Sequence, residues 1–242
     1  HIRMEGSYAR VGYTIDVCRG DEAWNSSQVW YLPFDDLNAE VTSDITWWPW
    51  REWYYTINVC NFTISRCSED NSQLSDKMKY IKGQMLFLRG LSYYNLVGYY
   101  QNPPLITDYA TYSSLDGLYG GNSTYDAVLD QIEKDFHEAM ELLPSRDKGS
   151  EWAGGRATCG AAAGYYARAL MMRHKYNDAL TVLKDIIAKK YGTYRLMDNY
   201  GDNFREGSAY ENNAESLFEV QFLDYGSQGT DLSLIHISEP TR

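Results

Sequence analysis

The sequence predicts a mainly α-helical fold, built from helical hairpins joined by long irregular loops, with at most one or two short strands. Several segments place apolar residues every three or four positions, which is the spacing of one face of an α-helix. Capping residues and prolines mark where these segments begin and end. Only one short segment, near the C-terminus, alternates in the manner of a strand.

The first predicted long helix starts at Ser75 and ends at Tyr100, because Gln101-Asn102-Pro103-Pro104 follows and proline cannot continue a helix. The next starts at Ser123 or Thr124, either of which can cap free N–H groups, and ends before Pro144. Its apolar stripe consists of Leu129, Ile132, Phe136, Ala139 or Met140, and Leu143. The charged residues between them are interpreted as a solvated face: Glu133, Lys134, Asp135, Glu138 and Glu141.

Two further helices are expected over 158–171 and 176–190, joined by a short turn, and the second ends at Lys189-Lys190, where cations suit a helix C-terminus. Alanines line the first and a tyrosine opens the second, a pattern that matches the helix–turn–helix unit of tetratricopeptide repeats. Residues 50–66 and 75–100 could form a second such pair. Residues 108–122, 191–213 and the Trp-rich stretch before Trp50 are expected to be loops, and residues 216–222 a strand.

Composition excludes several classes of function. The 242 residues contain 22 Lys and Arg against 33 Asp and Glu, a net charge of −11, and no basic run, which argues against nucleic acids and anionic membrane surfaces. No apolar stretch reaches the ~20 residues of a membrane-spanning helix. The four cysteines have neither C-x-x-C spacing nor nearby histidines, so we expect free thiols, no metal site and no cofactor.

The two ends of the chain suggest a fragment. The chain opens with His1-Ile2-Arg3 and carries no signal sequence, so we expect an upstream part to be missing. Residues 232–242 abandon the Tyr-, Asp- and Gly-rich character that precedes them and resemble a read-through tail of translated environmental fragments. We therefore expect one domain over residues 1–231, truncated at both ends, followed by a non-native tail.

An ordered set of motifs resembles the RagB/SusD family, the surface glycan-binding lipoproteins of Bacteroidetes. The matching segments cover roughly residues 45 to 225 and lie at 84–96, 104–106, 125–144, 155–170 and 215–222. Gln84 stands where the family commonly has Glu, Gly90 where it has Ala, and Asn102-Pro103 where it has a Gly-Asp-Val lead-in. The departures concern packing and loop shape, so the resemblance predicts a tetratricopeptide-like scaffold with a loop-rich ligand face.

The resemblance also implies partners and a location. Family members bind oligosaccharides or polysaccharides and sit as a lid over a SusC-like TonB-dependent transporter at the surface of the outer membrane. Their anchor is a lipid-modified cysteine that follows a signal peptide. Cys18 does not fit that role because no apolar segment precedes it, so we expect the anchor to be absent from this fragment.

Non-catalytic glycan capture is the first hypothesis for function. Six of the seven tryptophans fall within residues 24–53, and flat indole faces can stack on sugar C–H surfaces while polar side chains bind hydroxyls. The expected ligand-binding residues are Trp47 and Trp48, held by Pro49 before a helix, with Trp24, Trp30 and Asp21 upstream. Trp50 and Trp53, three residues apart, are instead expected to anchor that helix in the core.

Two alternatives remain open. A glycoside hydrolase would need two carboxylates on either side of the scissile bond, and the adjacent acids Asp21-Glu22 and Asp35-Asp36 fit turns better than such a pair. We therefore expect no catalytic residues. A repeat scaffold that binds peptides would place its aromatic residues on the inner helix faces, whereas glycan binding would expose them on loops.

Overall fold

The computed structural model describes residues 7–8, 11–21, 23, 29–40, 43–114, 120–148, 155–205, 207 and 209–220. The chain divides into two compact units: residues 1–56 with 220–242, and residues 57–219. We describe each by itself. The predicted tail at 232–242 lies outside the described residues, and the expected single domain over 1–231 stays a prediction.

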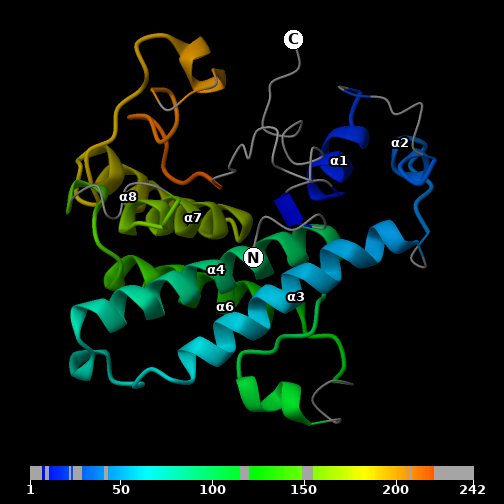
Figure 1. The fold of residues 1–242 in the computed structure, drawn as a ribbon, viewed down its shortest axis with the longest axis horizontal. Coiled ribbons are helices and arrows are strands. Elements are labelled where there is room, and N and C mark those ends of the chain that lie inside the picture. Colours follow the sequence, from blue (N-terminus) through cyan, green and yellow to red (C-terminus); the bar gives the residue numbers. More distant parts are fainter. Residues whose placement is uncertain are drawn as a thin grey trace, which may run out of the picture. The chain divides into compact units, whose positions relative to one another are not determined.

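The first unit contains α1 (Val11–Cys18), α2 (Leu32–Asp35) and the first half of α3 (Asp44–Ile64) (Figure 1). Helices α1 and α2 pack against each other. Buried side chains supply its core, among them Val11, Ile15, Phe34, Ile45 and Trp53. Trp53 thus anchors α3 as expected, while Trp50 is half-buried against the ring of Tyr54.

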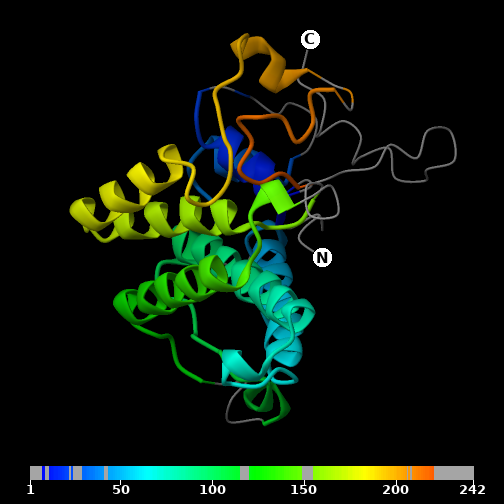
Figure 2. The same ribbon diagram turned by 90° about the vertical axis from the view of Figure 1, so that its left-hand side faces the viewer.

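The second unit is a stack of four helices, α4 (Asp76–Tyr100), α6 (Tyr125–Leu142), α7 (Cys159–Met172) and α8 (Tyr176–Ile187). Each packs against the next in chain order, and α7 and α8 form the predicted hairpin (Figure 2). The connections contain the 3₁₀ turns η2 (Asn71–Gln73), η3 (Tyr109–Ser113), η4 (Arg146–Lys148) and η6 (Tyr200–Phe204). The mainly α-helical, tetratricopeptide-like fold class is confirmed. Helix α4 packs extensively against α6 and also contacts α3 through the hydrogen bond from Arg89 to Asn61, and the expected pairing of residues 50–66 with 75–100 stays a prediction.

Side-chain caps fix the predicted helix starts. The hydroxyl oxygens of Ser75, Thr124 and Thr158 accept hydrogen bonds from the backbone N–H groups of the third residue on, at the starts of α4, α6 and α7. Ser123, the other candidate cap of α6, instead accepts a hydrogen bond from Leu105 N at 2.8 Å. At the other end of α4, Gln101 adopts a left-handed φ of 60°, which stops the helix.

Close packing inside the second unit depends on side-chain size. Between α4 and α6, Phe87 lies edge-on to Phe136 with ring centroids 5.7 Å apart, and both rings are fully buried. Along α7, small residues let neighbouring segments approach, and the buried ones include Ala161, Ala162, Ala163, Ala167 and Ala169. The hairpin core joins Ala163, Ala167 and Leu170 of α7 to Ala179 and Val182 of α8.

Two sequence-based expectations were wrong. Helix α3 begins at Asp44, so Pro49, Trp47 and Trp48 lie inside the helix and not before it. Pro49 is the sixth residue of α3, where its missing N–H forfeits the hydrogen bond to the carbonyl four residues earlier, and the helix continues through it. Residues 216–220, the described part of the expected strand, form no strand, since nothing described pairs with their backbone as a ladder.

All four cysteines are free thiols, and burial raises the pKa of the Cys60 thiol to about 12. Within the described part of the chain, no group of His, Cys, Asp or Glu side chains could hold a metal ion. No helix in the described ranges combines the length and apolar character needed to cross a bilayer.

Candidate functional site

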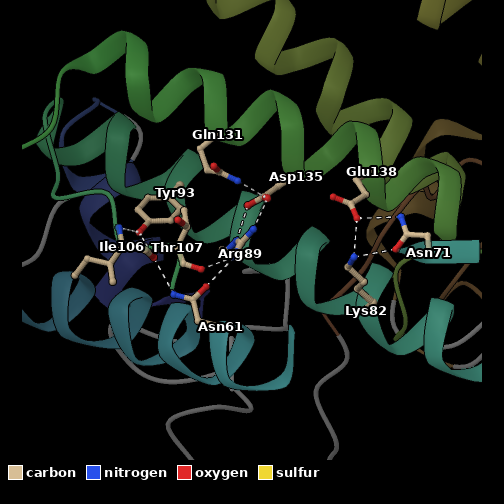
Figure 3. Close-up of polar contacts among 10 residues, drawn as sticks. All are labelled: Asn61, Asn71, Lys82, Arg89, Tyr93, Ile106, Thr107, Gln131, Asp135 and Glu138. Carbon is tan, nitrogen blue, oxygen red and sulfur yellow. Dashed lines mark hydrogen bonds and ion pairs between the residues drawn. The ribbon is translucent and has the colours of Figure 1, made fainter. Parts of the chain in front are cut away.

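A buried polar cluster around Arg89 lies between α4 and α6 (Figure 3). The Arg89 guanidinium donates to both carboxylate oxygens of Asp135, at 2.8 and 2.7 Å. Its remaining terminal nitrogen donates to Asn61 Oδ1 at 2.8 Å and to the Thr107 carbonyl at 3.1 Å. Both charged side chains are at most 5% exposed. Such a two-pronged pair fixes the position of two helices because it is directional as well as strong.

The same cluster holds the loop that follows α4. Asn61 Nδ2 donates to the Ile106 carbonyl at 2.8 Å, and the Tyr93 hydroxyl contacts both the N–H and the carbonyl of Ile106. Burial alone would lower the pKa of Arg89, but the Asp135 carboxylate outweighs it and raises that pKa. Burial also raises the pKa of the Tyr93 hydroxyl. Arg89 therefore stays charged and Tyr93 neutral, whereas burial raises the pKa of the Asp135 carboxyl against the opposing effect of Arg89.

A second polar cluster, around Lys82, joins the connection before α4 to α6 (Figure 3). Lys82 Nζ lies 3.0 Å from Glu138 Oε1 and donates to Asn71 Oδ1 at 2.8 Å. Asn71 Nδ2 donates to Glu138 Oε1 at 3.2 Å. Although burial opposes it, hydrogen bonds from Lys82 and Asn71 hold the pKa of Glu138 below its usual value. This cluster is more open to water, since the Glu138 side chain is 23% exposed.

The interpretation of Asp135 as part of a solvated face was therefore wrong, and Glu133 and Glu138 of the same predicted face are only partly exposed, at 13% and 23% of their side chains. Asp135 follows Ile132 by three residues and precedes Ala139 by four, which places it on the buried stripe of α6. Charge suggested an exposed position, but helical spacing already indicated a buried one. Arg89 carried a similar signal, because it lies between apolar positions on a helix that was expected to be covered on most sides.

The first half of α3 has its own buried carboxylate. Glu52 is 5% exposed and accepts a hydrogen bond from the Ser7 N–H at 3.1 Å. One residue on, Trp53 lies edge-on to Tyr8 with ring centroids 5.3 Å apart. These contacts tie residues 7–8 to α3. Glu52 was not singled out in the sequence, because no motif marks it.

The structure exposes two of the five predicted ligand-binding residues as large aromatic surfaces. Trp47, near the start of α3, is 50% exposed, and the Arg51 guanidinium lies 4.7 Å from its ring centroid. Trp30, before α2, is 51% exposed. Asp21 is exposed, Trp48 is half-buried, and Trp24 lies outside the described residues. No contact described between these residues brings them together, so their grouping as one site stays a prediction.

A small cleft lies in the second unit, between the start of α7 and the segment that follows η6. It encloses about 20 Å³ and is lined by Arg146, Thr158, Tyr194, Asn212 and Ser216, among others. Arg146 donates to the carbonyls of Asn212, Asn213 and Ser216, and its guanidinium lies over the Tyr194 ring. The arginine is thus engaged in holding the loop, and the cleft has room for little more than a water molecule.

Comparison with known protein families identifies the family of this chain. The SusD-like family model described as "Starch-binding associating with outer membrane" matches residues 6–171, more than half of the chain. The chain belongs to the SusD-like family. The motif residues of this SusD-like chain now have structural roles: Arg89 forms the buried ion pair, and Gln84 makes two hydrogen bonds with the Ala157 backbone at the start of α7.

Known relatives agree with the fold. A SusD-like protein of Formosa agariphila is 23% identical over 177 residues, which cover 72% of this chain and 31% of that protein. A SusD superfamily structure from Bacteroides vulgatus is 24% identical with a TM-score of 0.78, covering 90% of this chain and 46% of that one. A laminarin-binding SusD-like protein is 23% identical with a TM-score of 0.67, covering 83% of this chain and 44% of that one.

Surface glycan-binding protein A of Bacteroides uniformis is 19% identical with a TM-score of 0.72 and is covered over 49% of its length, against 91% of this chain. The chain therefore spans about a third to a half of these relatives. At such identities the solved structures establish the fold, and the ligands in their titles belong to those proteins.

Proposed function

We propose that this SusD-like chain belongs to a non-catalytic glycan-binding protein of the outer-membrane surface, which captures oligosaccharides or polysaccharides for a SusC-like TonB-dependent transporter. Family membership supports a carbohydrate ligand and an outer-membrane location, because the family description names both. The observation that carries the proposal is the half-exposed Trp47 ring, held on the rigid helix α3 beside Arg51.

The chemistry of Trp47 and Arg51 suits a sugar. An indole offers a flat apolar face to the C–H groups of a pyranose, and a guanidinium offers N–H donors to the hydroxyls at its edge. Arg51 is kept near the ring by its contact with Trp47 and by Glu52, whose carboxylate lies 3.4 Å away. Because both groups are positioned before any ligand arrives, binding would cost little side-chain entropy.

The buried carboxylates among the described residues are already engaged in contacts that hold the fold together. Asp135 is bound by Arg89 and Gln131, and Glu52 by the Ser7 backbone and Arg51. A glycosidase would need a carboxylic acid and a second carboxylate aimed at the same glycosidic bond. Because these carboxylates are already engaged, they support capture of a glycan without cleavage over the hydrolase alternative.

The test measures binding and cleavage together. Soluble starch and laminarin serve as the probes in affinity electrophoresis and calorimetry, with reducing-sugar release followed in the same samples. We expect Trp47→Ala to weaken binding about tenfold or more, as truncation of an aromatic anchor does. Tyr200→Ala is the matched control, since Tyr200 is an exposed aromatic residue of the second unit. Sugar release, or equal binding by both variants, would contradict the proposal.

A further inference from the structure

One arginine of α7 lies against two tyrosine rings, one from α4 and one from its own helix. The guanidinium carbon of Arg168 is 5.2 Å from the ring centroid of Tyr94 on α4 and 5.4 Å from that of Tyr165 on α7. The two rings are nearly perpendicular, with an interplanar angle of 84° and centroids 5.9 Å apart. Together they form a corner around the guanidinium, which attracts it from two sides. We call Arg168, Tyr94 and Tyr165 the Arg168 corner.

The Arg168 corner is built on the core of the second unit. The Tyr165 ring stacks on the buried Phe136 ring with centroids 5.4 Å apart, and it lies edge-on to the buried Phe87 ring at 5.6 Å. Tyr94 and Tyr165 are both partly covered, whereas Arg168 is exposed. The rings thus hold the arginine in place while it stays accessible at the surface. Little side-chain entropy would be lost when a ligand binds to it.

Arg168 has no acidic partner among the residues that the structure describes. No hydrogen bond or ion pair joins it to a carboxylate there, although the chain carries 33 Asp and Glu against 22 Lys and Arg. Arg173, just after the same helix, is by contrast paired with both Asp130 and Glu133. Contact with a ring does not use the five N–H donors of a guanidinium, which lie in its plane. The Arg168 corner therefore presents a positioned cation whose donors are unused.

We propose that the Arg168 corner is a further binding site, which takes the carboxylate of an acidic sugar, a uronic acid, in the captured glycan. The planar guanidinium matches the two oxygens of a carboxylate, and such a pair is stronger than a hydrogen bond to a neutral hydroxyl. Gly98, one turn beyond Tyr94, is exposed, and a Cβ atom there would meet no described atom within 4 Å, so the surface beside the corner is open. That the carboxylate belongs to a glycan rests on the proposed function.

The charge of the whole chain makes this contact selective. The net charge of −11 repels polyanions at long range, so an acidic ligand is held only where a cation meets it directly. A neutral glycan gains nothing from the charge of Arg168. The Arg168 corner should therefore distinguish a uronic acid from its uncharged ester.

The test compares a charged polysaccharide with its neutral form. Polygalacturonate and alginate, two polymers of uronic acids, are the probes in affinity electrophoresis and calorimetry of the chain, and fully methyl-esterified polygalacturonate supplies the same sugar rings without the charge. We expect both acids to bind and the ester not to bind. Arg168→Gln should weaken binding of the acids about tenfold or more, because a charge-assisted pair is lost. Arg195→Gln is the matched control, since Arg195 is a surface arginine of the same unit that already pairs with Asp198.

A second pair of variants tests the role of the rings. Tyr94→Leu removes one side of the Arg168 corner and should weaken binding of the acids about threefold, whereas Tyr94→Phe keeps the ring and should bind them like the native chain. Thermal melts check that each variant is folded. Binding of starch and laminarin, which tests Trp47, should not respond to Arg168→Gln, so the two proposals can fail separately.

Four results would overturn the proposal of an acidic-sugar site at Arg168. They are equal binding of the acids and the ester, no binding of either acid, binding of dextran sulfate or poly-glutamate in place of the uronic acids, and an equal loss of binding in Arg195→Gln. The third result would assign the Arg168 corner to a sulfated glycan or to an acidic protein segment.

Discussion

Two polar clusters of the same kind but of different depth join α4 and α6. In one, Arg89 and Asp135 are almost fully buried, and every donor and acceptor described for them finds a partner within the protein. In the other, the open cluster, Lys82 is buried but Glu138 is partly open to water. The comparison indicates that the depth of burial decides how much stability is lost when one partner of an ion pair is removed.

Deep burial makes the Arg89–Asp135 pair an architectural element. Removing either partner would leave the other charge without solvent or counter-charge, which is far more costly than the pair is stabilising. In the Lys82–Glu138 pair, Glu138 can fall back on water and Lys82 keeps Asn71 and the Ser68 carbonyl as hydrogen-bond partners, so loss of the pair costs less. A further difference concerns the loop after α4, which only the Arg89 cluster holds, through Thr107 and Ile106.

The largest expected effect comes from Asp135→Ala. This change leaves a buried guanidinium unpaired and should lower the free energy of unfolding by about 3–5 kcal/mol, measured by urea denaturation. Glu138→Ala, the matched change in the open Lys82 cluster, should lower the free energy of unfolding by about 1 kcal/mol. The double variant Arg89→Met/Asp135→Leu should recover much of the loss because no buried charge remains. Equal costs for Asp135→Ala and Glu138→Ala would refute the comparison.

A smaller effect is expected at the glycine beside Arg89. A Cβ atom at Gly90 would lie 3.1 Å from the ring of Phe136, which is fully buried and cannot yield. Gly90→Ala should therefore cost about 1–2 kcal/mol through overpacking, despite the better helix propensity of alanine. Gly98, in the same helix, has open space around it, so Gly98→Ala should gain about 0.5–1 kcal/mol. Thermal melts of the two variants should shift in opposite directions.

Much of the fold could be predicted from local chemistry. Hydroxyl caps and the residues before Pro103 set the limits of α4, α6 and α7 to within a residue or two, because those signals act on neighbouring backbone groups. The start of α3 was missed because Pro49 was interpreted as a boundary, whereas it lies in the second turn of a helix that continues through it. The prediction of a strand at 216–222 was wrong for the described residues 216–220, because a strand needs a second strand to pair with and an alternating sequence pattern does not provide one.

The candidate site was only partly predictable. Trp47 and Trp53 are six residues apart on one helix, so they face different directions, and one is exposed while the other is buried. The sequence pattern already assigned Trp53 to the core and Trp47 to the ligand, and the burial of Trp53 and the exposure of Trp47 agree with that division. Asp135 shows the reverse case, because its spacing indicated the core and its charge suggested the surface. Which exposed aromatics bind a ligand stays a prediction until the Trp47 experiment is done.

The smallest expected effect is the pH dependence of the stability that the open Lys82 cluster contributes. The pKa of Glu138 is lower in the folded chain than its ordinary value, so the folded state holds fewer protons there than the unfolded state. Its stabilisation is complete above the ordinary pKa of glutamate and is lost as the pH falls through the lowered one. We therefore expect Glu138→Gln to destabilise the chain at pH 7 but much less in strong acid.

Urea denaturation at neutral and acidic pH measures this difference in the free energy of unfolding. Glu141→Gln removes an exposed carboxylate one turn nearer the end of α6 and so controls for the general loss of one negative charge. A difference between Glu138→Gln and the native chain that grows as the pH falls would mean that Lys82 and Asn71 do not favour the ionised carboxylate. The open cluster would then be held by hydrogen bonds to the neutral acid, and its contrast with the Arg89 cluster would lie in charge as well as in depth.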